Sequence, residues 1–167
     1  IITNLIKVLG CGVEVKTKAN KQISTFNLDN LRWNKIVICT DADEDGFQIR
    51  TLILTMIQEL CPTLIEKGYV YIAESPLYEI TTKDHTYFAY TEPEKTKILG
   101  MIGDAKYTIQ RSKGLGENDP DMMSLTTMNP DTRRLIKVNP TDLEATREMF
   151  DVLLGNDLEG RKRFIKE

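Results

Sequence analysis

Histidine and cysteine, the residues of many catalytic and metal sites, are scarce in this chain. The only histidine, His85, lies in a polar turn, where we expect it to be exposed at the surface. Catalysis by a histidine base is therefore not expected. Cys11, Cys39 and Cys61 are an odd number without the Cys-x-x-Cys spacing of zinc sites. They indicate buried thiols in a reducing compartment and not a disulfide framework.

Long apolar runs and a basic excess are also lacking. No segment of the 167 residues approaches the length of a membrane span and no secretory signal opens the chain, so we expect a cytoplasmic protein. The formal net charge is −3, without the positive balance of many nucleic-acid-binding domains. An acidic domain can still contact DNA through a metal ion and a few cations. Such cations cluster at Arg111 with Lys113, at Arg133 with Arg134, and at Arg161 to Arg163.

The strongest chemical signal is a group of three carboxylates. The apolar run 36–39 is typical of a strand buried on both faces, and Asp41, Asp43, Asp45 and then Gly46 follow it. Open α/β sheets bind ligands at the carboxyl ends of such strands. Side chains two residues apart in an extended segment share a face, and two carboxylates about 5 Å apart repel by roughly 3 kcal/mol at an effective dielectric of about 20. Hard oxygen ligands without histidine or cysteine favour Mg²⁺ at this position.

The three acids also admit other interpretations. The same string opens a calcium-binding EF-hand loop, but the twelfth residue from Asp41 is Leu52 and not the required glutamate. An aspartyl-phosphate phosphatase with Asp41 as nucleophile remains open as an alternative. A non-catalytic scaffold whose acids cap the next helix also remains open, although three acids in five residues exceed that need.

Hydrophobic periodicity divides the chain into helices and strands. Helices are expected at 2–9, after Gly46 through Leu60, and at 62–67, 91–100, 120–125 and 143–154, while 157–167 is expected to be a final charged helix or a frayed tail. Strands are expected at 36–39, 69–73, 77–81, 86–90 and 107–110. Strand, helix and strand over 36–73 favour a right-handed βαβ unit, and the turn 82–85 favours a hairpin. The predicted fold class is therefore α/β, a parallel sheet flanked by helices with a β-hairpin and a mainly helical carboxyl-terminal tail.

Finer local signals support these elements. Thr91 with Glu94, and Thr141 with Glu144, fit capping boxes for the helices that follow them. The helix after the acids carries one apolar stripe, made of Ile49, Leu52, Ile53, Met56, Ile57 and Leu60. Because the chain starts inside a helical pattern without methionine, we expect a piece of a longer protein.

A glycine-rich segment, Lys113-Gly-Leu-Gly-Glu117, is the second candidate site. It is neither a Walker A loop nor a dinucleotide fingerprint, so alone it is a weak signal. Its glycines allow close approach of the backbone to a neighbour, and Arg111 and Lys113 carry the charge to contact phosphate.

Taken together, the motifs closely resemble the B subunits of bacterial type II DNA topoisomerases, gyrase and topoisomerase IV. The resemblance extends over nearly the whole chain in order and spacing. Its segments are Thr40 to Gly46, Ile49 to Leu52, Gly68 to Ala73, Pro76 to Tyr78, Gln110 to Glu117 and Thr126 to Arg133. It implies a Toprim-like domain over residues 1–106 with a hairpin insertion, and the family's carboxyl-terminal region over 107–167.

The resemblance also implies a chemistry. Asp41 and Asp43 would bind Mg²⁺, with Mn²⁺ as a substitute, and Asp45 would support them. Arg50, Arg111 and Lys113 would contact double-stranded DNA. The attacking tyrosine would belong to the A-type partner in an A2B2 enzyme, and ATP would bind in an amino-terminal region outside this chain.

The sequence departs from the family pattern in several places. The family's metal site uses a further glutamate from a Glu-Gly-Asp-Ser strand, and this motif is absent. Gln48 stands where histidine is common, and Ser112 where an aromatic residue is common. The last two departures leave open whether the chain resembles gyrase or topoisomerase IV more closely.

Overall fold

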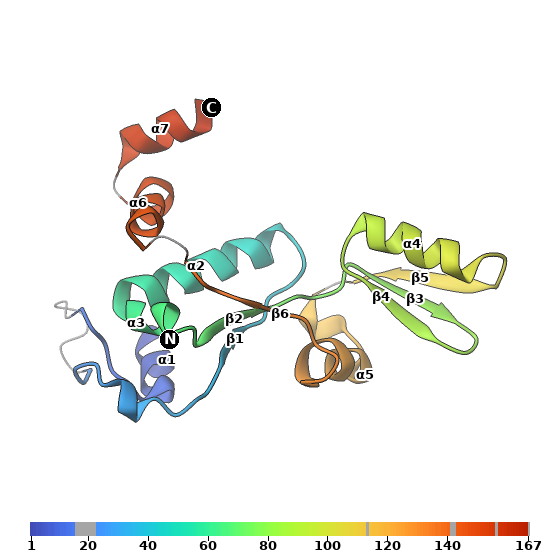
Figure 1. Ribbon diagram of the computed structural model, residues 1–167, viewed down its shortest axis with the longest axis horizontal. Helices are drawn as coiled ribbons and strands as arrows, with labels where there is room; N and C mark the ends of the chain where they lie inside the picture. The colour runs from blue at the N-terminus through green and yellow to red at the C-terminus, as the bar shows by residue number, and fades with distance from the viewer. Residues whose placement is uncertain (16–22, 113, 141–142, 156, 167) are drawn as a thin grey trace. The chain divides into compact units, whose positions relative to one another are not determined.

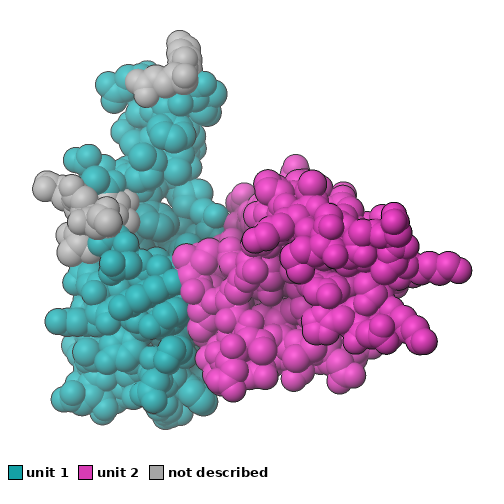
Figure 2. All heavy atoms as spheres, turned by 45° about the vertical axis from the view of Figure 1, so that its right-hand side comes forward, with its two compact units in different colours: residues 1–36, 51–71, 137–167 teal, residues 37–50, 72–136 magenta. Residues whose placement is uncertain are grey.

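The protein is represented by a computed structural model that describes residues 1–15, 23–112, 114–140, 143–155 and 157–166. The chain divides into two compact units (Figure 2). Unit 1 comprises residues 1–36, 51–71 and 137–167, and unit 2 comprises 37–50 and 72–136. The three acids and the glycine-rich segment both belong to unit 2.

The first sheet carries the acidic motif. Its strands β1 (Ile36–Ile38), β2 (Val70–Ala73) and β6 (Leu135–Lys137) lie in the order β1-β2-β6. The N–H of Val138 bonds to the carbonyl of Val70, and the N–H of Glu74 bonds to the carbonyl of Arg134. Residue numbers rise along β2 while those of its partners in β6 fall, so β2 and β6 are antiparallel. The parallel pair of the sheet is therefore β1 with β2. The helices α2 (Glu44–Leu60) and α3 (Pro62–Glu66) connect these two strands, which confirms the strand, helix and strand order predicted for 36–73.

The second sheet is small, antiparallel and wholly within unit 2. The predicted hairpin is present as β3 (Tyr78–Thr82) and β4 (Thr86–Ala89), and β5 (Tyr107–Arg111) pairs with the other edge of β3. The helix α4 (Glu92–Ile102) packs against β4 (Figure 1). Thr91 Oγ1 accepts a hydrogen bond from the N–H of Glu94, as in a capping box. The carboxylate of Glu94 accepts from the N–H of Tyr90 and not from that of Thr91, so the second bond of the box is displaced by one residue. The helix passes through Gly100 to Ile102, where we expected it to end at Gly100.

Short elements and helices complete the chain. α1 (Ile2–Leu9) ends as predicted at Gly10, which has a φ of 86° and whose N–H bonds to the carbonyl of Ile6. The remaining elements are the 3₁₀ turns Leu28–Asn30 and Leu115–Glu117, α5 (Pro120–Met123), a π-helical turn (Ser124–Met128), α6 (Leu143–Leu154) and α7 (Leu158–Lys166). The predicted cap of α6 by Thr141 lies outside the described residues.

Each unit has its own buried side chains. In unit 1 the fully buried set includes Ile6, Val13, Leu64 and Val70, together with Cys11 and Cys61. In unit 2, Ile80 and Ala89 are buried in the small sheet. The fold is thus the mixed α/β class predicted, with a helical carboxyl-terminal part.

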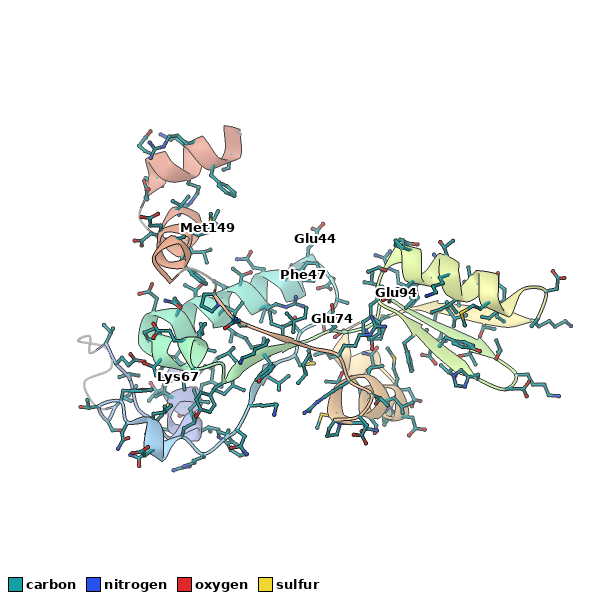
Figure 3. All side chains as sticks on the ribbon, viewed as in Figure 1. Glu44, Phe47, Lys67, Glu74, Glu94 and Met149 are labelled. Carbon is teal, nitrogen blue, oxygen red and sulfur yellow. The ribbon has the colours of Figure 1, made fainter. Side chains whose placement is uncertain are left out.

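The apolar stripe predicted on α2 is only partly buried. Ile57 is 3% exposed, whereas Ile49 and Leu52 are 51% and 52% exposed. Phe47, labelled with Glu44 near the start of the helix in Figure 3, is 49% exposed. β1 is similar, since Ile38 is buried but Ile36 and Val37 are half-buried, so the prediction of a strand buried on both faces was only partly correct.

Candidate metal centre

The backbone just before the acids is held in place by side chains of unit 2. Thr40 follows β1 and is 5% exposed. Its carbonyl accepts a hydrogen bond of 3.2 Å from Ser75 Oγ, and its Oγ1 lies 3.5 Å from Nη2 of Arg50. These contacts fix the point at which the chain leaves the strand and the carboxylates begin.

Asp41 contacts the glycine-rich segment. The N–H of Leu115 donates a hydrogen bond of 2.7 Å to Oδ1 of the half-buried Asp41. A Cβ built on Gly114 would lie 3.3 Å from Oδ2 of the same carboxylate. The two candidate sites of the sequence therefore meet at one side chain.

Asp43 caps the helix that follows. It immediately precedes α2, and its Oδ1 accepts a hydrogen bond of 2.7 Å from the N–H of Gly46, the third residue of that helix. This is the geometry of a helix N-cap. One element of the scaffold interpretation is thus present, but the cap uses only one oxygen of the exposed carboxylate.

Asp45 is exposed in the first turn of α2. Across the part of the chain that the structure describes, no three His, Cys, Asp or Glu side chains converge as a group able to hold a metal ion. Asp41 and Asp43 nevertheless suit Mg²⁺, which commonly binds one or two carboxylates and fills its remaining positions with water and phosphate oxygens. Each of the two uses a single oxygen in the hydrogen bonds to described residues.

Arg50 lies beside this group. Its guanidinium stacks 5.1 Å from the ring of Phe47, and its Nε is buried without a hydrogen-bond partner among the described residues. Arg50 is half-buried, so it is less exposed to solvent than a typical surface cation.

Arg111 is the exposed last residue of β5. It lines a pocket of about 640 Å³ together with Glu79, Gln110, Ser112, Asn118, Asp119 and Met122. Two of these lining residues, Glu79 and Asp119, are acidic. Lys113 lies outside the described residues.

One arginine in each of the other two clusters, Arg134 and Arg161, has structural partners. Arg134 pairs with Glu94 at 2.8 Å and stacks 3.9 Å from the ring of Tyr90. Arg161 donates to the carbonyls of Val152 and Gly155 and so caps the end of α6. These two arginines hold the fold together locally.

The histidine and two of the three thiols occupy the places that the sequence indicated. Cys11 and Cys61 are buried, and Cys39 is half-buried. Burial raises the pKa of Cys39, and the negative charge of Asp41 raises it further, while a hydrogen bond with Thr127 opposes the shift. His85 is exposed in the hairpin turn. Within the described residues, none of the helices is long and apolar enough to cross a membrane.

Sequence reasoning missed the contact between Asp41 and Leu115. The two residues are 74 positions apart, and a main-chain N–H leaves no signature in the residue type. The only available signal was the pair of glycines, which indicated a close backbone approach without naming its partner.

Comparison with known proteins assigns the chain to a family. Residues 2–75 match the Toprim domain, and residues 104–166 match the carboxyl terminus of the DNA gyrase B subunit. The DNA gyrase B subunit of Clostridium acetobutylicum is 46% identical over 144 residues, which are 85% of this chain and 23% of that protein. The equivalent protein of Archaeoglobus fulgidus is 40% identical over 98% of this chain and 24% of its own length, and that of Halalkalibacterium halodurans is 41% identical over 99% and 25%. The chain spans about a quarter of the length of these relatives. It belongs to the family of DNA gyrase B subunits, of which it carries the Toprim domain and the carboxyl-terminal region.

Proposed function

We propose that this chain is part of the DNA-cleavage and religation core of an ATP-dependent type II topoisomerase. The main support is the similarity of nearly its whole length to gyrase B subunits, combined with the acids that follow β1. Because the chain spans about a quarter of those relatives, the activity belongs to a complete subunit together with its partner.

Asp41 and Asp43 are the proposed ligands of Mg²⁺, for which Mn²⁺ can substitute, and Asp45 supports them through water or hydrogen bonds. When bound, the metal ion polarises the scissile phosphate and stabilises the leaving 3′ oxygen. The N–H of Leu115 bonds to Oδ1 of Asp41, and the N–H of Gly46 bonds to Oδ1 of Asp43. Each carboxylate thereby keeps its second oxygen for the ion.

The proposed DNA contacts are Arg50, Arg111 and Lys113. Arg50 lies next to Thr40 at the start of the acidic motif, which supports a contact near the scissile phosphate. Arg111 is exposed three residues before Gly114, on the segment that contacts Asp41. Arginine and lysine contacts of this kind position DNA without reading its sequence.

The remaining parts of the reaction lie outside this chain. The attacking tyrosine is proposed to come from the A-type partner in a cytoplasmic A2B2 enzyme, and ATP to bind in another region of the complete B-type protein. Within the chain, we propose a Toprim domain over residues 1–106, with the hairpin as an insertion, and a gyrase B-type carboxyl-terminal region over 107–167.

The similarity to gyrase B subunits favours this function over an aspartyl-phosphate phosphatase. The scaffold alternative draws support from the cap that Asp43 forms on α2. That cap does not account for Asp41, whose hydrogen-bond donor comes from a distant segment and not from the helix.

DNA cleavage by the full-length protein, reconstituted with its A-type partner, tests the proposal. Asp41→Asn and Asp43→Asn are expected to abolish Mg²⁺-dependent cleavage while the far-UV circular dichroism stays unchanged. Asp84→Asn, which removes the same charge from the exposed hairpin turn, is the matched control and is expected to cleave normally. Wild-type cleavage by Asp41→Asn would contradict the assignment.

A further inference from the structure

The main chain of Gly114 and Leu115 lies directly against the carboxylate of Asp41. The N–H of Leu115 occupies Oδ1 at 2.7 Å. Gly114 lies beside Oδ2, close enough that a Cβ on it would be 3.3 Å from that oxygen. Leu115 therefore binds Oδ1 of Asp41, and Gly114 leaves space next to Oδ2 of the same carboxylate.

The local conformation makes this N–H available. Gly114, with φ −60° and ψ 151°, caps the 3₁₀ turn Leu115–Glu117. The first N–H groups of a helical turn have no partner within that turn. The carboxylate of Asp41 satisfies one of them, so the contact forms without disturbing either segment.

We propose that Leu115 is a positioning residue for Asp41, acting through its main-chain N–H, and that Gly114 lacks a side chain so that Oδ2 stays accessible to the metal ion. This inference rests on the proposed role of Asp41 as a metal ligand. A hydrogen bond to one oxygen restricts rotation of the carboxylate and presents the other oxygen in one orientation. Groups that orient a metal ligand in this way are commonly worth 10- to 100-fold in metal affinity, as an approximate range.

A proline substitution isolates the N–H. Leu115→Pro removes the donor at the first position of a 3₁₀ turn, where the fixed φ of proline is well tolerated. The preceding residue already has the extended ψ that proline requires of it. Leu115→Ala keeps the N–H and loses only the side chain, so it separates the two effects.

An alanine substitution tests the space beside Oδ2. At Gly114 the backbone has a negative φ that alanine adopts readily, so any effect arises from the new methyl group near Asp41. Gly116→Ala is the matched control in the same turn, because a Cβ there would meet no atom within 4 Å.

The experiment uses electron paramagnetic resonance to measure the Mn²⁺ affinity of the full-length protein, with thermal unfolding of every variant as the check on folding. Leu115→Pro is expected to weaken Mn²⁺ binding about tenfold or more. Gly114→Ala is expected to weaken it less, and Leu115→Ala and Gly116→Ala to bind as the wild type does. Amide hydrogen exchange at Leu115 is expected to accelerate in Asp41→Ala, which checks the hydrogen bond itself. Weaker Mn²⁺ binding by Leu115→Pro at an unchanged unfolding temperature is the result that a merely structural role for the turn would not produce.

The outcomes separate this inference from the proposed function. Loss of Mn²⁺ binding in Asp41→Asn, with wild-type affinity in both Leu115→Pro and Gly114→Ala, would overturn the inference and leave the metal site standing. If Leu115→Pro does not fold, the comparison of Gly114→Ala with Gly116→Ala decides the question. Wild-type affinity in Asp41→Asn would overturn both.

Discussion

Gly46 lies against the main chain of Asp41 so closely that a Cβ on Gly46 would overlap the carbonyl oxygen of Asp41. A glycine is thus required at this position, because the first turn of α2 lies against the main chain of Asp41. Its N–H in turn holds Asp43. The string Asp-x-Asp-x-Asp-Gly is therefore a single packed turn in which the glycine and two of the acids depend on one another.

Gly46→Ala is expected to destabilise the protein by about 3 kcal/mol, because the overlap is with main-chain atoms that cannot rotate away. Urea denaturation followed by circular dichroism measures this change. Gly100→Ala is the control, because Gly100 lies inside α4 with open space around it. Alanine there is expected to raise the free energy of unfolding by about 0.5–1 kcal/mol. Equal stability of the two variants would contradict the packing described.

Substitutions of Asp43 separate its capping role from metal binding. Asp43→Asn keeps an oxygen acceptor for the N–H of Gly46, so the free energy of unfolding is expected to stay near that of the wild type. Asp43→Ala loses the cap and is expected to cost about 1 kcal/mol. Both variants are expected to lose Mg²⁺-dependent cleavage. Full cleavage by Asp43→Asn would mean that Asp43 serves only as a cap.

Local patterns predicted most of the secondary structure but few of the contacts at the site. The strand at 107–110 and the helix at 2–9 followed from periodicity and glycine punctuation, and the structure has them at 107–111 and 2–9. The pairing of β5 with β3 joins segments about thirty residues apart and depends on tertiary packing. The contact between Asp41 and Leu115 spans 74 residues, beyond the reach of any local pattern.

The exposed apolar residues of α2 mark another limit of sequence reasoning. Ile49 and Leu52 belong to a regular helical stripe, and periodicity correctly predicted the helix. It did not predict burial, because burial depends on what covers the stripe along its length. The structure buries Ile57 near the end of the helix and leaves Ile49 and Leu52 about half exposed.

Arg50→Met tests the proposed DNA contact. Methionine loses the contact of the guanidinium with the Phe47 ring but also removes a buried Nε that lacks a partner among the described residues. Because these two changes oppose each other, stability is expected to change little. If Arg50 contacts phosphate, the slope of log affinity against log salt falls by about one unit. Lys83→Met removes a charge from the exposed hairpin turn and is expected to leave the slope unchanged. An unaltered slope in Arg50→Met would remove Arg50 from the proposed DNA contacts.

Cys61 is expected to be unreactive and to make the fold sensitive to alkali. Burial raises its pKa from about 9 to about 12, so the thiol stays protonated in the folded protein where the unfolded chain ionises. The contribution of this thiol to the free energy of unfolding is fully present below pH ~9 and is lost as the pH rises toward about 12. Alkylation with iodoacetamide, followed by peptide mass spectrometry, is expected to label the half-buried Cys39 before Cys61. Equal labelling rates would contradict this burial.

The central claim is that Asp41 and Asp43 bind a divalent metal ion, and Mn²⁺ titration monitored by the amide NMR spectrum tests it most directly. Paramagnetic broadening acts over a limited distance, so a site on these carboxylates is expected to broaden first the amide signals of residues 41–43 and of Leu115, whose N–H contacts Asp41. Asp41→Asn is expected to abolish this selective broadening. Signals at the site that remain sharp while those of Asp84 and other exposed acids broaden would contradict the account.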